Sequence, residues 1–190
     1  MTGDPLPLPD PPIGTDRWTL RPWSERDARA LHRAWLEPSI ATATAVPEDP
    51  SPERARHWIS GQAVRRQRGA ALDLAIVTLA EGQGADQVLG EIGIAIVDST
   101  RRWAEVGWWL FPEARGAGIA GDVLARFASR ITPAANLVRL FARIPITNTP
   151  SERVAGRAGF DRIGITDDDL GIWVFTTPIA SEKDSATVPP

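Results

Sequence analysis

The sequence predicts an α/β domain with one mixed, mostly antiparallel sheet of about seven strands, flanked by about four helices. Two patterns support this fold class. In the first half of the chain, apolar runs with strand-like character follow one another through short turn-forming segments, which is typical of antiparallel hairpins. In the second half, strands alternate with amphipathic helices, which indicates parallel pairing through crossover connections. We therefore expect helices on both faces of the sheet.

Each element is predicted from its hydrophobic period and from the residues that begin or end it. Ser24 is a good N-cap for the first helix, and Pro38 is expected to end that helix near Glu37. Ser51 followed by Pro52 is a typical cap and first-turn pair for a second helix. In chain order, we predict a strand over 17–23, helices over 24–37 and 51–68, strands over 71–80, 88–97 and 103–111, a helix over 119–131, a strand over 137–144, a helix over 150–158, and strands over 160–165 and 170–177.

Composition excludes several classes of protein. The 190 residues, 43% of them hydrophobic, are enough for one domain with a sizeable core. The absence of cysteine excludes disulfides, thiolate zinc sites and a cysteine nucleophile. The net charge of −3 lacks the basic footprint of a nucleic-acid binder. The chain has no apolar run of about eighteen residues and no signal-peptide pattern. We therefore expect a cytoplasmic protein that binds neither nucleic acid nor membranes.

Both ends of the chain have the composition of tails. Residues 1–16 are rich in proline and show little hydrophobic period, and residues 180–190 are polar and end in proline. We expect the first segment to be a disordered spacer and the second to be flexible. Residues 17–179 are then expected to form a single domain.

The most informative stretch covers residues 104–121 and reads AEVGWWLFPEARGAGIAG. It joins an apolar strand to a glycine-rich turn, and the turn opens a helix whose apolar residues recur at three- and four-residue spacing. Glycines let backbone N–H groups approach an anion, and the helix N-terminus adds unpaired amides and a positive dipole end. The stretch therefore predicts a phosphate-binding site.

One interpretation of this site is a dinucleotide fold, because residues 116–121 formally match G-x-G-x-x-G. That pattern requires a turn directly after the first strand and an acidic residue at the end of the next strand. Here residues 112–115 separate the strand from the glycines, and the next strand carries Arg139 and Arg143 but no acid. An arginine there could suit a 2′-phosphorylated dinucleotide, so an NADP-binding oxidoreductase remains an alternative.

A competing pattern, Arg-x-x-Gly-x-Ala, occupies residues 115–120, and two further blocks follow it, Asn-Thr-Pro-Ser over 148–151 and Arg-Ala-Gly-Phe over 157–160. In this order and spacing, the three blocks resemble the acyl-CoA pyrophosphate loop and the downstream motifs of the GNAT superfamily of N-acetyltransferases. The arrangement is most similar to the branch that includes the ribosomal-protein N-terminal acetyltransferases. The resemblance covers residues 17–178 and implies the GNAT fold.

The resemblance also implies a site for acetyl-CoA. The loop amides would hold the pyrophosphate with Arg115 beside them, and the strand before the loop would bond the pantetheine through its exposed backbone, where it splays from its neighbour. Strand alternation places Trp108 and Trp109 on opposite faces, so one is expected in the core and the other at the acceptor cleft. The residues assigned to acetyl-CoA are Trp109, Leu110, Phe111, Arg115, Gly116, Ala117, Gly118, Ile119, Ala120, Asn148 and Ser151.

Acyl transfer from a thioester to an amine needs a proton donor for the departing thiolate and a base for the amine. The family often uses a tyrosine as the donor, but this chain has no tyrosine. By resemblance, Ser151 takes that role directly or through water, and its alternative role is a helix cap. Glu105 and Glu91, expected to be sheet neighbours, are the candidates for the base, with a solvated carboxylate as the alternative for each. No cluster of histidines and carboxylates predicts a metal site.

These observations predict an N-acetyltransferase that moves an acetyl group from acetyl-CoA to a primary amine, on a protein N-terminus or on a small molecule. Because cysteine is absent, we expect direct transfer within a ternary complex and no acyl-enzyme. The main alternative is a non-catalytic acyl-CoA-binding regulatory module, which keeps the glycine loop and lacks a proton donor. We expect a monomer or a homodimer.

Overall fold

The computed structural model describes residues 4–79, 86–100 and 102–175. Three predicted features lie outside the described residues. They are the turn around residues 82–84, the last residues of the strands predicted to reach 80 and 177, and the tail over 180–190. Among the described residues, no helix is long and apolar enough to cross a membrane.

The elements follow the predicted order with small differences in their bounds. The strands are β1 (Trp18–Pro22), β2 (Ala71–Thr78), β3 (Val88–Asp98), β4 (Trp103–Leu110), β5 (Arg139–Pro145), β6 (Phe160–Ile165) and β7 (Leu170–Phe175). The helices are α1 (Ala28–Leu36), α2 (Pro38–Ala41), α3 (Pro52–Gln67), α4 (Ile119–Ala134) and α5 (Thr149–Arg157), with 3₁₀ turns η1 (Glu25–Asp27) and η2 (Pro112–Ala114).

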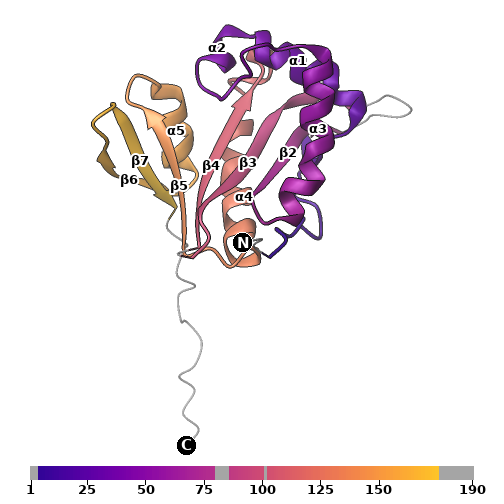
Figure 1. Cartoon of the computed structure of the whole chain (residues 1–190). Helices are drawn as coiled ribbons and strands as arrows, with labels where there is room; N and C mark the ends of the chain where they lie inside the picture. The colour runs from indigo at the N-terminus through magenta and orange to yellow at the C-terminus, as the bar shows by residue number, and fades with distance from the viewer. Residues whose placement is uncertain (1–3, 80–85, 101, 176–190) are drawn as a thin grey trace, which may run out of the picture.

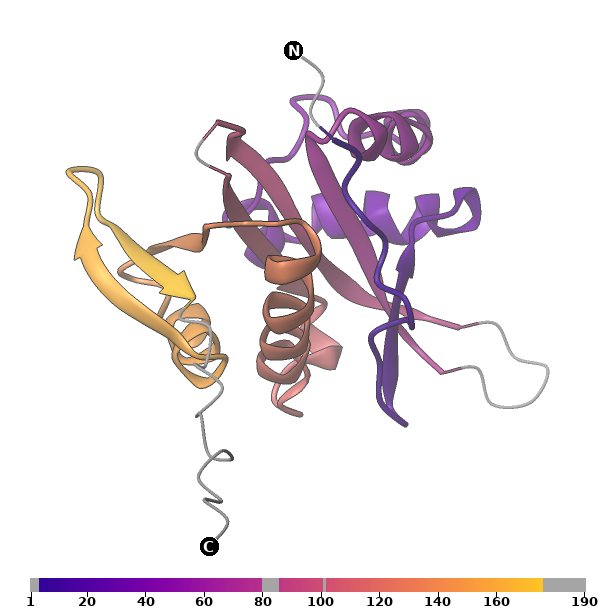
Figure 2. The same cartoon turned by 90° about the horizontal axis from the view of Figure 1, so that it is seen from below.

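All seven strands form one sheet in the order β1-β2-β3-β4-β5-β7-β6. Every pairing is antiparallel except that of β4 with β5, which is parallel. Helices α1 and α3 cover one face of the sheet and α4 the other (Figures 1 and 2). The predicted fold class is confirmed.

The single parallel pairing is short. Only residues 103–105 of β4 pair with residues 139–141 of β5. Beyond them β4 continues along β3 while β5 continues along β7, so the two parts of the sheet diverge (Figure 1). The sheet is therefore open along one side of β4.

Helix α2 was missed by the prediction because Pro38 was interpreted as the end of the first helix. Proline lacks only an N–H that the first helical turn leaves unpaired, so it can also begin a helix. Here Pro38 starts α2, and the carboxylate of Glu37 caps it by accepting a hydrogen bond from the backbone N–H of Ser39 at 3.3 Å. Ser24 begins the preceding helical segment as predicted, through a capping box with Asp27.

Two apolar clusters, one on each face of the sheet, form the core. The larger packs α4 against the sheet and includes Trp18, Ile94 and Phe127. The smaller lies under α1 and α3 and includes Trp23 and Trp109. This second cluster lies against the end of β4, where the sheet opens.

Residues 4–16 pack against the domain, unlike the disordered spacer that their composition predicts. Leu6 and Ile13 are 5% and 4% exposed and belong to the larger cluster. The backbone N–H of Leu6 donates to the Arg66 carbonyl oxygen at 3.0 Å, and Arg130 Nη2 donates to the Asp10 carbonyl oxygen at 3.0 Å. Two buried apolar side chains and these bonds are enough to fix a segment that lacks any periodic pattern.

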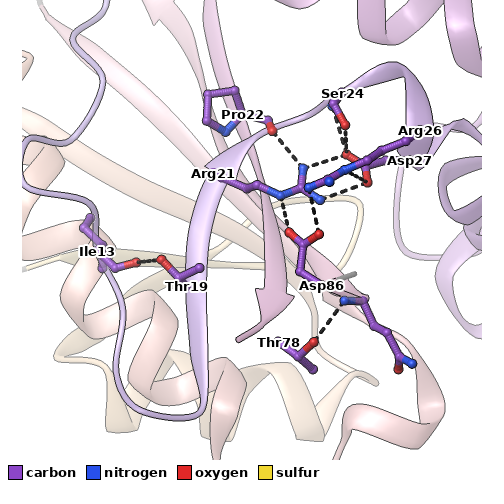
Figure 3. Close-up of polar contacts among 10 residues, drawn as sticks. Ile13, Thr19, Arg21, Pro22, Ser24, Arg26, Asp27, Thr78 and Asp86 are labelled. Carbon is purple, nitrogen blue, oxygen red and sulfur yellow. Dashed lines mark hydrogen bonds and ion pairs between the residues drawn. The ribbon is translucent and has the colours of Figure 1, made fainter. Parts of the chain in front are cut away.

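A charged network fixes the junction between β1 and α1 (Figure 3). Arg21 donates to both carboxylate oxygens of Asp27 at 2.7 and 2.9 Å, and its Nε donates to Asp86 at 2.6 Å. Burial alone would raise the pKa of Asp27, but the hydrogen bonds from Arg21 and from Ser24 outweigh burial and lower it.

We predict that Arg21→Ala lowers the free energy of unfolding by about 3 kcal/mol, because it leaves the carboxylate of Asp27, 5% exposed, with only the exposed Arg26 at 4.0 Å. Urea titration measures this loss. Because folding lowers the pKa of Asp27, this residue stabilises the protein at pH values above its unfolded-state pKa of about 3.9. That stabilisation is lost as pH falls through its folded-state pKa. In Arg21→Ala this acid-dependent loss should shrink. Arg26→Ala is the control, since its exposed pair with Asp86 is worth less than about 1 kcal/mol, and equal losses in both variants would contradict the prediction.

Candidate functional site

A cavity of about 680 Å³ lies where β4 and β5 diverge. The end of β4, the glycine loop and the first turn of α4 line one side, and residues 145–157 around the start of α5 line the other. Ser39, Thr42 and Ala43 of the α2 region close a third side. This volume lies within the range of about 300–1,000 Å³ that is usual for small-molecule and cofactor pockets.

The glycine loop gives the cavity the features that suit an anion. Gly116 and Gly118 have φ values of 84° and 77°, a left-handed conformation that strains any residue with a side chain. A Cβ added at either glycine would meet no protein atom within 4 Å, so the space beside the loop is open. Gly118 is the N-cap of α4, and residues 119–121 of the first helical turn line the cavity. Unpaired amides and the positive end of the helix dipole therefore lie next to open space.

Arg115 lines the cavity and holds the loop in place. Its Nε donates to the Leu110 carbonyl oxygen at 3.0 Å, and its Nη2 donates to Ser39 Oγ at 2.9 Å. The guanidinium thus joins the end of β4 to α2. Arg157, from the last predicted motif, adds a second positive charge on the α5 side.

Asn148 and Ser151 lie together on the α5 side of the cavity. Asn148 is the N-cap of α5, and its Oδ1 accepts a hydrogen bond from the backbone N–H of Ser151 at 3.2 Å. Ser151 is therefore not the cap. Its hydroxyl makes no hydrogen bond to another described residue. The side chain that caps and the hydroxyl that is available for chemistry belong to different residues.

The two tryptophans at the end of β4 lie on opposite faces of the strand, as predicted, and both residues line the cavity. Trp109 is 8% exposed and packs on Trp23 and Phe111, with ring centroids 6.4 and 5.2 Å away. Trp108 is half-buried and packs against the α4 cluster. Each tryptophan thus packs against a core cluster and also contributes to the cavity wall.

The two candidate bases have different surroundings. Glu105 accepts two hydrogen bonds from Arg143, at 2.9 and 2.8 Å, and is not among the cavity residues. Glu91 pairs in register with Trp109, whereas Glu105 pairs with Ala95. The expectation that the two glutamates are sheet neighbours was therefore wrong by four residues of β4, because the register depends on the turn between β3 and β4.

The carboxyl group of Glu91 is buried next to the end of β4. Trp109 Nε1 donates to Glu91 Oε1 at 3.2 Å, and Oε2 is buried without a partner among the described residues. Burial raises the pKa of Glu91, and the negative charge of Asp73 raises it further, while the Trp109 indole opposes them. A carboxyl group with a raised proton affinity thus lies behind the cavity wall, bonded to Trp109, which forms part of that wall.

Most of the residues assigned to acetyl-CoA line this cavity, with Phe111 and Ala117 as the exceptions. Phe111 is buried under α1, where Arg33 stacks on its ring, and the Ala117 carbonyl oxygen accepts a bond from Arg17. The cavity residues of the α2 region were not predicted, and only Pro38 gives a sequence signal there, as a possible helix start.

The fold and the cavity define a class of protein that binds a phosphate-bearing, extended ligand where a mixed sheet opens. The chain belongs to the GNAT acetyltransferase family: the family model for the acetyltransferase (GNAT) domain matches residues 17–161. It is therefore an acyl-CoA-dependent acetyltransferase, and acetyl-CoA is the acyl donor of this family. The dinucleotide interpretation of the glycine loop is wrong.

Relatives and solved structures agree with this family. The chain is 25% identical over 154 residues to the uncharacterized N-acetyltransferase p20 of Bacillus licheniformis, with 81% of this chain and 84% of the relative covered. It is 26% identical over 129 residues to the ribosomal-protein-serine acetyltransferase of Escherichia coli, with 68% and 67% covered. The fold matches RimL, an acetyltransferase solved with coenzyme A, with a TM-score of 0.71 and 20% identity over 92% of this chain and 98% of that one.

We predict that Gly118→Asp abolishes coenzyme A binding, because it places a negative side chain in the open space beside the helix N-terminus and strains a residue with φ of 77°. Calorimetry with coenzyme A measures the affinity. Gly61→Ala on α3, which also meets no atom within 4 Å, is the control and should bind as the wild type does. A folded Gly118→Asp protein with near-wild-type affinity would place the cofactor elsewhere.

Proposed function

We propose that this protein is an N-acetyltransferase that moves the acetyl group of acetyl-CoA directly to a primary amine, on a protein N-terminus or on a small molecule. The observation that carries the proposal is that one cavity brings together the glycine loop, the open edge of β4 and the Ser151 hydroxyl. An anion site, a backbone edge and a proton donor are the groups that thioester aminolysis needs.

The donor would lie along the open edge of β4. The pyrophosphate would bind the amides after Gly118, with Arg115 and Arg157 adding positive charge, and the pantetheine amides would bond the backbone of Trp109 and Leu110 as an added strand does. Support comes from the pairing pattern, because β5 leaves this edge of β4 after Glu105.

In the transfer step, the neutral amine nitrogen attacks the thioester carbon, the carbon–sulfur bond breaks, and the thiolate takes a proton. Ser151 is the proposed proton donor, and Asn148 positions it by capping α5. The nitrogen loses a proton, which water beside the Trp109 indole carries to Glu91. We propose Glu91 in preference to Glu105, although neither lines the cavity, because Arg143 occupies both oxygens of Glu105 whereas Glu91 is bonded to the indole of Trp109, a residue that does line it.

The relatives support both acceptor classes. The Escherichia coli relative is a ribosomal-protein-serine acetyltransferase, and a structure with a TM-score of 0.65 and 16% identity, covering 84% of this chain and 95% of that one, is a spermidine N-acetyltransferase chimera. The test is to incubate the protein with acetyl-CoA and a panel of N-terminal peptides, polyamines, aminoglycosides and simple amines, and to follow thiol release. A non-catalytic binding module would bind acetyl-CoA and release no thiol above the spontaneous rate with any acceptor.

We predict that double-reciprocal plots against both substrates intersect, because a chain without cysteine lacks the usual acyl carrier and must bind donor and acceptor together. Initial rates of thiol release over a grid of both concentrations provide the measurement. Parallel lines, together with an acyl-enzyme trapped and seen by mass spectrometry, would contradict direct transfer.

We predict that Ser151→Ala lowers kcat by about ten-fold to a thousand-fold and leaves the dissociation constant of coenzyme A nearly unchanged, as expected for loss of a general acid. Ser129→Ala on the exposed face of α4 is the control and should keep wild-type turnover. If Ser151→Ala turns over normally, water is the proton donor and Ser151 only shapes the cavity.

A further inference from the structure

A second polar cluster lies on the sheet face under α3, one strand beyond Trp109. Asp73 on β2 and Glu91 on β3 project from the same face of adjacent strands, since Asp73 pairs with Gly93 and Glu91 with Ala75. Asp73 and Glu91 are therefore diagonal neighbours, offset by two residues along the strands. Their carboxyl groups lie within reach of each other.

Gly93 lets the two acidic side chains approach. A Cβ added there would lie 2.2 Å from Asp73 Oδ1, which means that the Asp73 carboxyl group lies across β3 in the space that a side chain would fill. That space is next to Glu91, two residues away on the same strand face. Arg65 Nη2 donates to Asp73 Oδ2 at 2.7 Å from the α3 side.

Several buried polar atoms of this cluster have no partner among the described residues. They are Glu91 Oε2, Trp23 Nε1, Gln62 Nε2 and Arg65 Nε. The Trp23 indole faces Glu91 and the Gln62 amide faces Asp73, each without regular hydrogen-bond geometry. Buried polar groups in proteins are usually paired, often by ordered water.

A second cavity, of about 230 Å³, adjoins these groups. Trp23, Gln62 and Asp73 line its inner side, and Leu8 and Arg66 line its outer side, where Leu8 is 42% exposed. A water molecule occupies about 30 Å³ in the liquid, so the cavity has room for several, with polar partners on its wall.

We propose that Asp73 and the second cavity form the proton exit of Glu91, with Asp73 as a positioning residue that acts through Glu91. This inference rests on the proposed function. The proton that the amine nitrogen loses goes to the Glu91 carboxylate and passes by way of Asp73 to water in the second cavity, which returns Glu91 to its charged form. The second cavity shares no lining residue with the cavity of about 680 Å³, so proton release does not need the donor to leave.

Electrostatics supports this role. The charged groups that face Glu91 are Asp73 from β2 and Arg65 from α3, while Trp23 and Trp109 contribute uncharged indoles. Burial raises the pKa of both Asp73 and Glu91, and the charge of Asp73 raises that of Glu91 further. Removing the charge of Asp73 should therefore lower the pKa of Glu91.

The first test needs no acceptor. The indole N–H of Trp109 donates to Glu91 Oε1, so its ¹⁵N resonance, assigned with Trp109→Phe, reports the charge of Glu91. We expect a titration midpoint above the ordinary glutamate value of about 4.3 in the wild type, a lower midpoint in Asp73→Asn, and no titration in Glu91→Gln. Glu53→Gln, an exposed carboxyl at the start of α3, is the control and should keep the wild-type midpoint. An unchanged midpoint in folded Asp73→Asn overturns the coupling.

The second test is kinetic, with a short peptide bearing an N-terminal serine and with spermidine as acceptor probes. Asp73→Asn should lower kcat about ten-fold and move the acid limb of kcat/KM to lower pH, with the affinity for coenzyme A unchanged. Gln62→Leu keeps the Asp73–Arg65 pair and should lower kcat about three-fold without moving the acid limb of kcat/KM. This variant therefore provides the test if Asp73→Asn does not fold. A wild-type kcat and pH profile in folded Asp73→Asn, or a wild-type kcat in Gln62→Leu, overturns the exit, even where the melting temperature is lower. A wild-type kcat in Glu91→Gln overturns the proposed base instead.

Discussion

The short parallel contact between β4 and β5 is the constraint on which the rest of the site depends. Three residues of each strand pair, and then each strand keeps only its outer neighbour, β3 for β4 and β7 for β5. Backbone groups on the inner edge of β4 are left without a strand partner in a region walled by two core clusters. Such groups need a polar partner, and an extended ligand with amides can provide it. The divergence also turns the glycine loop and the start of α5 toward the same space, so the anion site and Ser151 face one cavity.

Arginines connect the α1 and α2 side of this cavity to the segment that leads into the glycine loop. Arg33 on α1 pairs with Glu113 in η2 at 2.8 Å and stacks on the Phe111 ring at 3.6 Å. Arg115 joins the end of β4 to Ser39 on α2. Exposed ion pairs contribute little to stability individually, but together these contacts connect α1 and α2 to the segment that leads into the loop.

Much of this arrangement could be predicted because it is encoded locally. The glycine loop, the caps at Ser24 and Ser51 and the order of the elements depend on residues close together in the chain. The features that were missed depend on distant contacts. The β3–β4 register placed Glu91 beside Trp109, the packing of Leu6 and Ile13 fixed a segment without period, and the start of α2 at Pro38 has the same sequence signal as a helix stop. Burial of the Asp73 and Glu91 carboxyl groups, which gives them their chemistry, has no sequence signature at all.

The buried acidic pair is costly for stability, and this cost supports a functional origin. Because the pKa values of both groups are raised in the folded protein, their protonated forms are favoured there, and stability falls as pH rises from the unfolded value of about 4 through the folded values. A single arginine, Arg65, offsets the negative charges of two buried carboxyl groups. Apolar residues at the same positions would avoid the desolvation cost of burying them. Raised proton affinity is useful where a base must work near neutral pH, and Glu91 is bonded to Trp109, which lines the cavity where β4 and β5 diverge. The same burial that weakens the fold at neutral pH thus gives Glu91 the proton affinity that a base for an amine requires.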